Sequence, residues 1–357
     1  MTTATRPDRR ARALGSPVPG LAAAVVLAIV STAIGSVAPI IGSAVPAVVL
    51  GAVIATVRRP SARLTPGLTF AGQRVLQIAV VVLGLRLSLH QVVTVGARSL
   101  PVMLGTLVVC LLLAHLIGRA LRIDGDLQAL IGCGTGICGA SAIAAIAPAI
   151  GAASADIAYA VSTIFVFNIA AVLVFPVIGH ALGLSQHAFG LFAGTAVNDT
   201  SSVVAAASAY GHSAADYAVV VKLVRTLMII PVVLVLATVT ERRRTRSGDG
   251  RSGHQPRTKG PTPAVSLGRI VRLVPWFLVG FLVMAGINTA GLVPGGATEP
   301  IATISTFLIS IALAGIGLST DVAALRRTGV RPLVLGAILW VTVTVVSLGL
   351  QAATTGW

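Results

Sequence analysis

The sequence predicts an all-α polytopic membrane protein, and three observations support that prediction. Its 357 residues are 55% hydrophobic and only 10% charged, with a mean hydropathy of +0.95. So few charged side chains could not cover the surface of a soluble globule of this length. Apolar stretches of about 20 residues recur along the chain, which is the length that an α-helix needs to cross a bilayer. Most of these stretches are apolar on every side, whereas a helix on a soluble core has a polar face.

Hydropathy predicts about eleven membrane segments. Their expected ranges are 20–37, 40–57, 74–90, 99–121, 127–150, 157–179, 186–209, 215–240, 270–290, 300–318 and 332–352. Residues 1–19 are expected to form a polar tail, 20–240 the first eight segments, 241–268 a disordered basic loop and 269–357 the last three segments. A second apolar run follows the first at once, which favours an uncleaved first helix over a signal peptide.

The distribution of basic residues predicts a cytoplasmic N-terminus. The net charge is +16, and most of the 26 lysines and arginines fall in the tail, in the 241–268 loop and in alternate short loops. This pattern follows the positive-inside rule for an inner (plasma) membrane protein. Because topology accounts for the charge, the expected partner is the lipid bilayer and nucleic-acid binding is not expected.

Two glycine-rich stretches interrupt the predicted helices at membrane depth. The first, 131–150, holds four glycines within eight residues, and the second, 191–210, repeats part of it at an offset of 60, with Gly194 and Thr195 matching Gly134 and Thr135. Glycine favours unwound backbone, which is tolerated at membrane depth where it lines protein or a cavity. Paired discontinuous helices predict a transport site and an inverted repeat. Both full crossing and re-entry of the two stretches preserve the predicted orientation, so both remain open.

A second internal similarity lies at an offset of 231 residues. Its members are Gly84, Leu87, Ser88, Pro101, Leu104 and Gly105 in one copy and Gly315, Leu318, Ser319, Pro332, Leu335 and Gly336 in the other. In each copy a helix is expected to end at the serine and the next to open at the proline. Inverted repeats explain this pattern, and chance matches among apolar residues are the alternative.

Polar side chains in and after the two stretches form the candidate site. The expected substrate-binding residues are Thr135, Cys138, Ser141, Thr195, Asn198, Ser201, Lys222 and Arg225. Lys222 and Arg225 share one face of an apolar helix, where a central cation costs about 2.5–3.5 kcal/mol and therefore usually faces a cavity or a counter-charge. Snorkelling is the alternative for Lys222, two turns into its helix. Helix N-termini at the two breaks would add partial positive charge, which favours an oxyanion.

Asp199 is the candidate coupling residue and the candidate counter-charge for Lys222 or Arg225. The group could form a static buried ion pair, or a pair that opens to admit an anion or a proton. The sequence leaves these two interpretations open.

Cysteines and histidines do not suggest metal chemistry. Cys110, Cys133 and Cys138 all lie in apolar segments, and the six histidines are scattered without ligand spacing. No metal and no cofactor are therefore expected. An intramembrane enzyme with Cys138 as nucleophile is not expected either, because no histidine base lies near it in sequence.

Several motifs resemble the YeiH-type family of sulfate exporters. They are GTGICGASAIAA, AGTAVNDTSSVVAAA, KLVR at 222–225, and GLST and RPLVLG near the end, within a likeness that runs from about Pro66 to Gly349. The resemblance implies a multi-span bacterial inner-membrane transporter, related in architecture to bile-acid symporters and cation/proton antiporters with crossed discontinuous helices. That family more often has histidine before the aspartate of the second motif. This chain has Asn198 there, so a role for that histidine in proton coupling does not carry over.

These observations lead to a secondary active transporter that exports a small oxyanion such as sulfate or a sulfonate. It is expected to work by alternating access around a midplane site at the two broken helices, with H⁺ or Na⁺ as coupling ion. A sodium-coupled organic-anion symporter is the alternative within transport, and a membrane sensor or scaffold without flux is the alternative from another class. A homodimer is compatible with the sequence.

Overall fold

The structure is a computed structural model that describes residues 16–37, 43–58, 60–246, 275–319 and 330–354. Every regular element within these ranges is helical, which confirms the all-α prediction. The chain divides into unit 1, Met1–Ala79 with Thr303–Asp321, and unit 2, Val80–Ala302 with Val322–Trp357. Most of the predicted N-terminal tail, and residues 247–268 of the predicted basic loop, lie outside the described residues.

Seven helical stretches in the described ranges are long and apolar enough to cross a membrane. They are Val18–Val37, Thr65–Arg86, Leu89–Ala120, Ser154–Ala181, His212–Thr240, Thr298–Leu318 and Val330–Thr354. Ala44–Val57, Ala140–Ile150 and Trp276–Thr289 are shorter apolar helices. The structure thus agrees with a polytopic membrane protein. Its long spans are fewer than the segments predicted, because several of those segments consist of short helices.

Unit 1 contains α1 (Val18–Val37), α2 (Ala44–Val57), α3 (Thr65–Phe70), the π-helical turn η2 (Ala71–Val75) and most of α15 (Thr298–Leu318). α1 packs on α2 and α3. α2 approaches α15 where Gly51 faces Gly317, since a Cβ on Gly51 would lie 2.9 Å from the Gly317 Cα. Small residues allow membrane helices to pack at such short distances.

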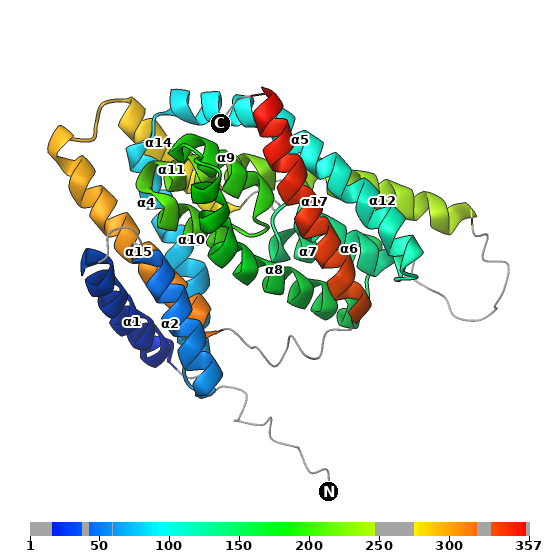
Figure 1. Cartoon of the computed structure of the whole chain (residues 1–357), viewed down its shortest axis with the longest axis horizontal. Coiled ribbons are helices and arrows are strands. Elements are labelled where there is room, and N and C mark those ends of the chain that lie inside the picture. Colours follow the sequence, from blue (N-terminus) through cyan, green and yellow to red (C-terminus); the bar gives the residue numbers. More distant parts are fainter. Residues whose placement is uncertain (1–15, 38–42, 59, 247–274, 320–329, 355–357) are drawn as a thin grey trace, which may run out of the picture. The chain divides into compact units, whose positions relative to one another are not determined.

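Unit 2 begins in α4 (Leu76–Leu83) and the 3₁₀ turn η3 (Gly84–Arg86), followed by the 32-residue α5 (Leu89–Ala120). Ser88 and Gln91 form a capping box that starts α5, and the helix continues through Pro101. This differs from the prediction that Pro101 opens a helix, because the capping box nucleates α5 twelve residues earlier. α17 (Val330–Thr354) packs along α5 and also on α9 (Figure 1).

Two pairs of short helices lie between the long ones. α6 (Gly125–Gly136) and α7 (Ala140–Ile150) precede α8 (Ser154–Ala181), and α9 (Gln186–Ala196) and α10 (Thr200–Tyr210) follow it. A helix of 11 or 12 residues is about 17 Å long, roughly half the thickness of the hydrocarbon core. Each short helix can therefore reach only about the midplane.

The α9–α10 pair is a helical hairpin. The Tyr210 hydroxyl donates to the Leu184 carbonyl, and the Tyr210 ring stacks on Phe189 with 3.9 Å between ring centroids. The end of α10 thus lies beside the start of α9, so of the two arrangements that the sequence left open for 186–209, a full crossing or re-entry, the hairpin agrees with re-entry. Hydropathy could not detect this reversal, because both halves are equally apolar. α6 and α7 likewise contact each other across a link of three residues.

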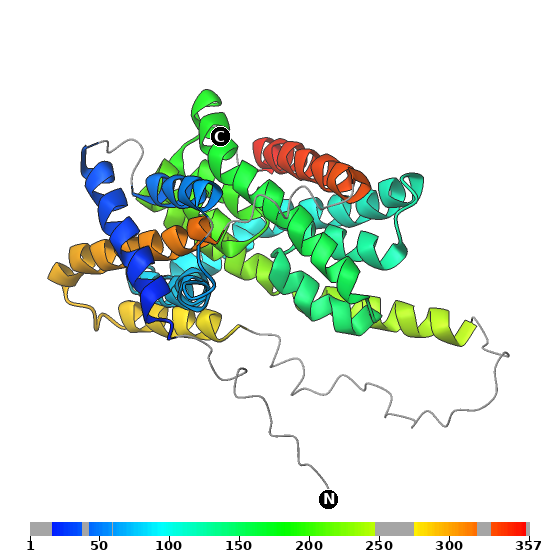
Figure 2. The same ribbon diagram turned by 90° about the horizontal axis from the view of Figure 1, so that it is seen from below.

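Unit 2 continues with α11 (His212–Thr226) and α12 (Ile229–Arg246), and α12 extends from the end of α11 in both views (Figures 1 and 2). α12 runs six residues into the stretch that was predicted to be disordered from 241. α14 (Trp276–Thr289) packs on η3, and the 3₁₀ turn η4 (Gly295–Ala297) precedes α15.

Candidate functional site

The tips of the two hairpins meet inside unit 2. The tips are the links Ile137–Gly139 and Val197–Asp199 between the paired helices. Gly139 has φ +66° and ψ −132°, and a Cβ built on it would lie 3.0 Å from the Asp199 Cβ. Only glycine adopts this backbone conformation without strain and leaves room for the second tip. The glycine that sequence analysis associated with unwinding is therefore also a contact between the two hairpins.

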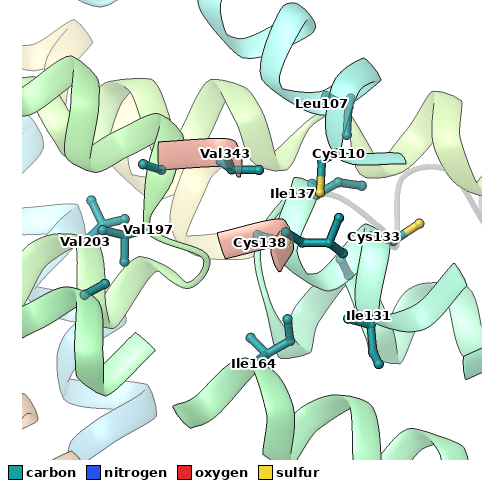
Figure 3. Close-up of a cluster of buried hydrophobic side chains, with 14 of the residues drawn as sticks. Leu107, Cys110, Ile131, Cys133, Ile137, Cys138, Ile164, Val197, Val203 and Val343 are labelled. Atoms are coloured by element: carbon teal, nitrogen blue, oxygen red, sulfur yellow. The ribbon is translucent and has the colours of Figure 1, made fainter. Parts of the chain in front are cut away.

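Apolar side chains pack against both tips, although Asp199 at the end of the second tip is partly exposed. Figure 3 shows Ile137 and Cys138 of the first tip and Val197 of the second among neighbours from α5, α6, α8, α10 and α17. All three cysteines are buried in this cluster and are free thiols. A charged or polar group at the tips is thus held in an apolar environment, where its electrostatic interactions are strong.

Lys222 joins the two tips from α11. Its side chain is fully buried, and Nζ donates to the Ile137 carbonyl at 2.7 Å and to the Val197 carbonyl at 2.8 Å. Residues 137 and 197 are matched by the 60-residue offset in the sequence. One ammonium group therefore binds equivalent positions of the two hairpins.

Arg225, one turn further along α11, makes a similar bridge. Its guanidinium is fully buried and donates through Nε to the Gly136 carbonyl at 2.8 Å, through Nη2 to the Thr135 carbonyl at 3.2 Å, and through Nη1 to the Thr195 carbonyl. Residues 135 and 195 are again an offset pair. The accepting carbonyls lie at the last turns of α6 and α9, which carry partial negative charge and lack partners within their own helices. The C-terminal ends of two half-helices thus hold both cations.

Asp199 occupies the opposite kind of helix end. It is the N-cap of α10, where its carboxylate accepts from the Ser202 backbone N–H at 2.9 Å and from the hydroxyls of Ser201 and Ser202. The sequence suggested a direct ion pair with Lys222 or Arg225, but the hydrogen bonds of all three groups go elsewhere. The physical reason is that the helix ends already supply opposite partial charges to each of them.

Asn198 is a buried amide at the second tip. Its side chain is 1% exposed, and neither Nδ2 nor Oδ1 has a hydrogen-bond partner in the described part of the chain. A buried amide without partners costs about 1–3 kcal/mol per unsatisfied group, so such groups usually serve a purpose. Asn198 is therefore the polar group at the tips with the most unused hydrogen-bonding capacity.

The other predicted site residues also lie at or beside the two tips, but their side chains differ in solvent exposure. Thr135, Cys138 and Thr195 are buried, Ser201 is half-buried, and Ser141, in the first turn of α7, is exposed. The Thr195 hydroxyl lies 2.6 Å from the Ser347 hydroxyl of α17 and also donates to the Leu191 carbonyl. All eight predicted substrate-binding residues thus lie at the tips, in the adjoining helix turns or on α11.

Some partners at the site were missed from the sequence. Ser347 lies in an apolar helix far along the chain, and only its small polar side chain could have marked it. Ser202 could have been found, because an aspartate three residues before a serine at a helix start is typical of an N-cap. Away from the tips, Asp216 in the apolar α11 was also missed, and it forms an ion pair with Arg86 at 3.1 Å.

Comparison with known proteins gives a family. The model for "Conserved hypothetical protein 698" matches residues 19–336. The chain is 39% identical to a UPF0324 membrane protein of Clostridium tetani, over 93% of this chain and 96% of the relative. It is 37% identical to one of Streptococcus agalactiae serotype V, over 95% and 98%, and 40% identical to one of Streptococcus mutans, over 93% and 96%. Together with the seven long apolar helices, these matches show that the chain is a multi-pass membrane protein and belongs to the YeiH-type, UPF0324 family of conserved hypothetical protein 698.

Proposed function

We propose that the protein is a secondary active transporter of a small oxyanion such as sulfate or a sulfonate, with export as the direction that the family resemblance implies. The substrate would bind at the two hairpin tips. The observation that carries this proposal is the charge at the tips. With both cations protonated, Lys222 and Arg225 supply two positive charges and Asp199 supplies one negative charge. The partial charges of two helix C-termini and two helix N-termini oppose each other, which leaves an excess of positive charge in an apolar core.

The two hairpins also support alternating access, in which the substrate site opens to one side of the membrane and then to the other. Each pairs helices of half-membrane length, and their tips contact each other through Gly139 and Asp199. In an inverted repeat the two hairpins would enter from opposite sides of the membrane and meet at its midplane. The matched carbonyl contacts of Lys222 and Arg225 at residues 60 apart support such a relation. With both hairpins re-entrant, a cytoplasmic N-terminus keeps the topology predicted from the basic residues.

The amide of Asn198 and the N–H groups of the first turn of α7 would bind the anion. The α7 N-cap is Gly139, which has no side chain to bind these N–H groups, whereas Asp199 already caps α10. An oxyanion at the α7 N-terminus would satisfy donors that the helix leaves unpaired. Lys222 and Arg225 would hold the tips together and contribute positive potential, without direct contact in this conformation.

Flux measurement tests the proposal. Purified protein reconstituted in proteoliposomes should exchange radiolabelled sulfate, or a small sulfonate, faster than empty liposomes, in a proton or sodium gradient. Sodium dependence with an organic anion only would favour the symporter alternative. Saturable binding without flux in either gradient would contradict transport and would favour a sensor.

Asp199→Asn should leave anion binding intact and remove the dependence of flux on the proton gradient. Asparagine is as good an N-cap as aspartate, so the start of α10 should persist, while the group that could take up a proton is lost. Flux would be measured in proteoliposomes at several internal and external pH values. The variant Asp124→Asn is the matched control, because Asp124 is likewise an N-cap, of α6, but lies away from the tips. Proton-driven flux in Asp199→Asn would place the coupling group elsewhere.

Thr135→Val and Thr195→Val, at matched positions of the two hairpins, should each weaken substrate affinity while the protein still folds. Valine keeps the shape of threonine and removes one hydroxyl, which typically contributes about 1 kcal/mol, or about fivefold in affinity. Thr195→Val should in addition lower the melting temperature slightly, because Ser347 loses its hydrogen-bond partner. If only one of the two variants changes the affinity, the two hairpins do not contribute equally to the site.

A further inference from the structure

A cavity in unit 2 lies away from the hairpin tips. It has a volume of about 870 Å³ and lies among the start of α5, α9, α11 and the end of α17. This volume is in the range of sites for small organic molecules and is far larger than a bare inorganic anion requires. The residues of its wall come from α5, η3, the α8–α9 loop, α9, α11 and α17, so one rigid helix does not create it alone.

The outer part of this cavity is basic. Arg86, Arg98, His90 and His187 line it, and Asp216 is the acidic residue among its lining residues. Asp216 is paired with Arg86, and the side chains of the pair are 15% and 21% exposed. Arg98 is exposed, and Tyr217 of α11 lines the same cavity. With one arginine paired and the other open to solvent, the rim favours an anion.

The deep part is apolar. Leu191 and Val220 are 2% and 1% exposed, and Val95 packs against the same cluster as Leu191. Val102, Met103, Leu191 and Val221 form that cluster. Lys222, which donates to the tips, follows Val221 on α11. The cavity thus has a charged rim and a buried apolar floor, and none of the residues that line it belongs to the two tips.

We propose that this cavity is a separate binding site for an organic anion, with the anionic head group at Arg98 and Arg86 and an apolar body against Val95, Leu191 and Val220. An anion that contacts only the rim would gain little binding free energy, because the rim is exposed to water. A ligand that also buries apolar surface on the floor gains the larger, non-electrostatic part of its affinity there. Inorganic sulfate lacks that second part and binds this site more weakly than an aryl sulfonate of the same head-group chemistry.

Equilibrium binding to the purified full chain tests this site without any transport assay. Toluene-4-sulfonate, sodium sulfate and the neutral 4-methylbenzyl alcohol are titrated calorimetrically, each against a detergent blank. Toluene-4-sulfonate should bind more tightly than sulfate. Arg98→Gln should weaken it about tenfold, the effect of losing one charge-assisted contact. Arg119→Gln, about 30 Å away at the other end of α5, is the matched control and should leave the affinity unchanged.

Two further variants separate the rim from the floor. Asp216→Asn frees Arg86 and should tighten binding of both anions, whereas Val95→Thr, which keeps the side-chain shape, should weaken toluene-4-sulfonate and leave sulfate unchanged. Equal affinity of the wild type and Arg98→Gln for toluene-4-sulfonate overturns the proposal. Sulfate that binds as tightly as the aryl sulfonate and loses the same affinity in Arg98→Gln overturns it too. If the expected pattern is found in a protein that carries no anion flux, the transport proposal fails and this site stands.

Discussion

Replacing Arg225 by alanine should remove anion uptake and lower the free energy of unfolding by about 3–5 kcal/mol, the cost of deleting one member of a buried charged network. The guanidinium donates to three carbonyls, two at the end of α6 and one at the end of α9. Without it these groups stay buried and unpaired, and the two hairpins lose one of the two side chains that join them. Lys222 alone would then bridge the tips.

The melting temperature can be followed with a thiol-reactive fluorescent dye, because Cys110, Cys133 and Cys138 are buried around the tips and react only when this region opens. Arg119→Ala is the control, since Arg119 is exposed at the end of α5. Arg225→Lys should restore part of the stability through a single carbonyl contact. It should restore less of the anion binding, because lysine lacks the planar guanidinium group with its several N–H donors. An Arg225→Ala protein with normal stability and normal uptake would show that the carbonyl network is not needed.

Gly139→Ala should disturb the site more than any other single-methyl substitution at a glycine with positive φ. Its φ of +66° and ψ of −132° lie in a region that other residues avoid, at a cost of about 1–3 kcal/mol. The new Cβ would also lie 3.0 Å from the Asp199 Cβ, so the two tips would have to separate. A displacement that costs the bound state about 1.4 kcal/mol weakens anion binding tenfold.

The matched control is Gly183→Ala. Gly183 has φ +64°, but nothing lies within 4 Å of a Cβ built on it. Both variants would be compared for melting temperature and for anion affinity. Gly183→Ala should lower the stability modestly without changing the affinity, whereas Gly139→Ala should change both. Equal effects of the two substitutions would mean that backbone conformation, rather than contact between the tips, determines the result.

The repeat at an offset of 60 residues was the most informative pattern in the sequence. It marked Thr135 and Thr195 as equivalent, and the structure shows that Arg225 binds the carbonyls of both. The hydroxyl groups were expected to matter, yet the contacts to the cations come from the backbone. Side-chain identity cannot reveal this, because every residue has a carbonyl and only the end of a helix leaves it free.

Asp199 illustrates the opposite case. A lone carboxylate and two cations in apolar sequence suggest an ion pair, because burial of unpaired charge is costly. The sequence does not show that helix ends would stand in for the missing partners. The start of α10 supplies donors to Asp199, and the ends of α6 and α9 supply acceptors to Lys222 and Arg225.

The sequence by itself determined that the protein is all-helical and membrane-embedded, which stretches are rich in glycine, and which polar residues to examine. These features depend on composition and on neighbours along the chain, such as the glycines at 132–139 and the cations one turn apart at 222 and 225. Only the tertiary structure decided that 186–210 returns as a hairpin, that Gly139 contacts Asp199 and that Ser347 meets Thr195. These contacts join residues up to 152 positions apart. Hydrophobicity places each helix in the membrane, but its contribution to the free energy is the same for every arrangement of apolar helices. Side-chain packing and the unpaired backbone groups at helix ends therefore determine which arrangement forms.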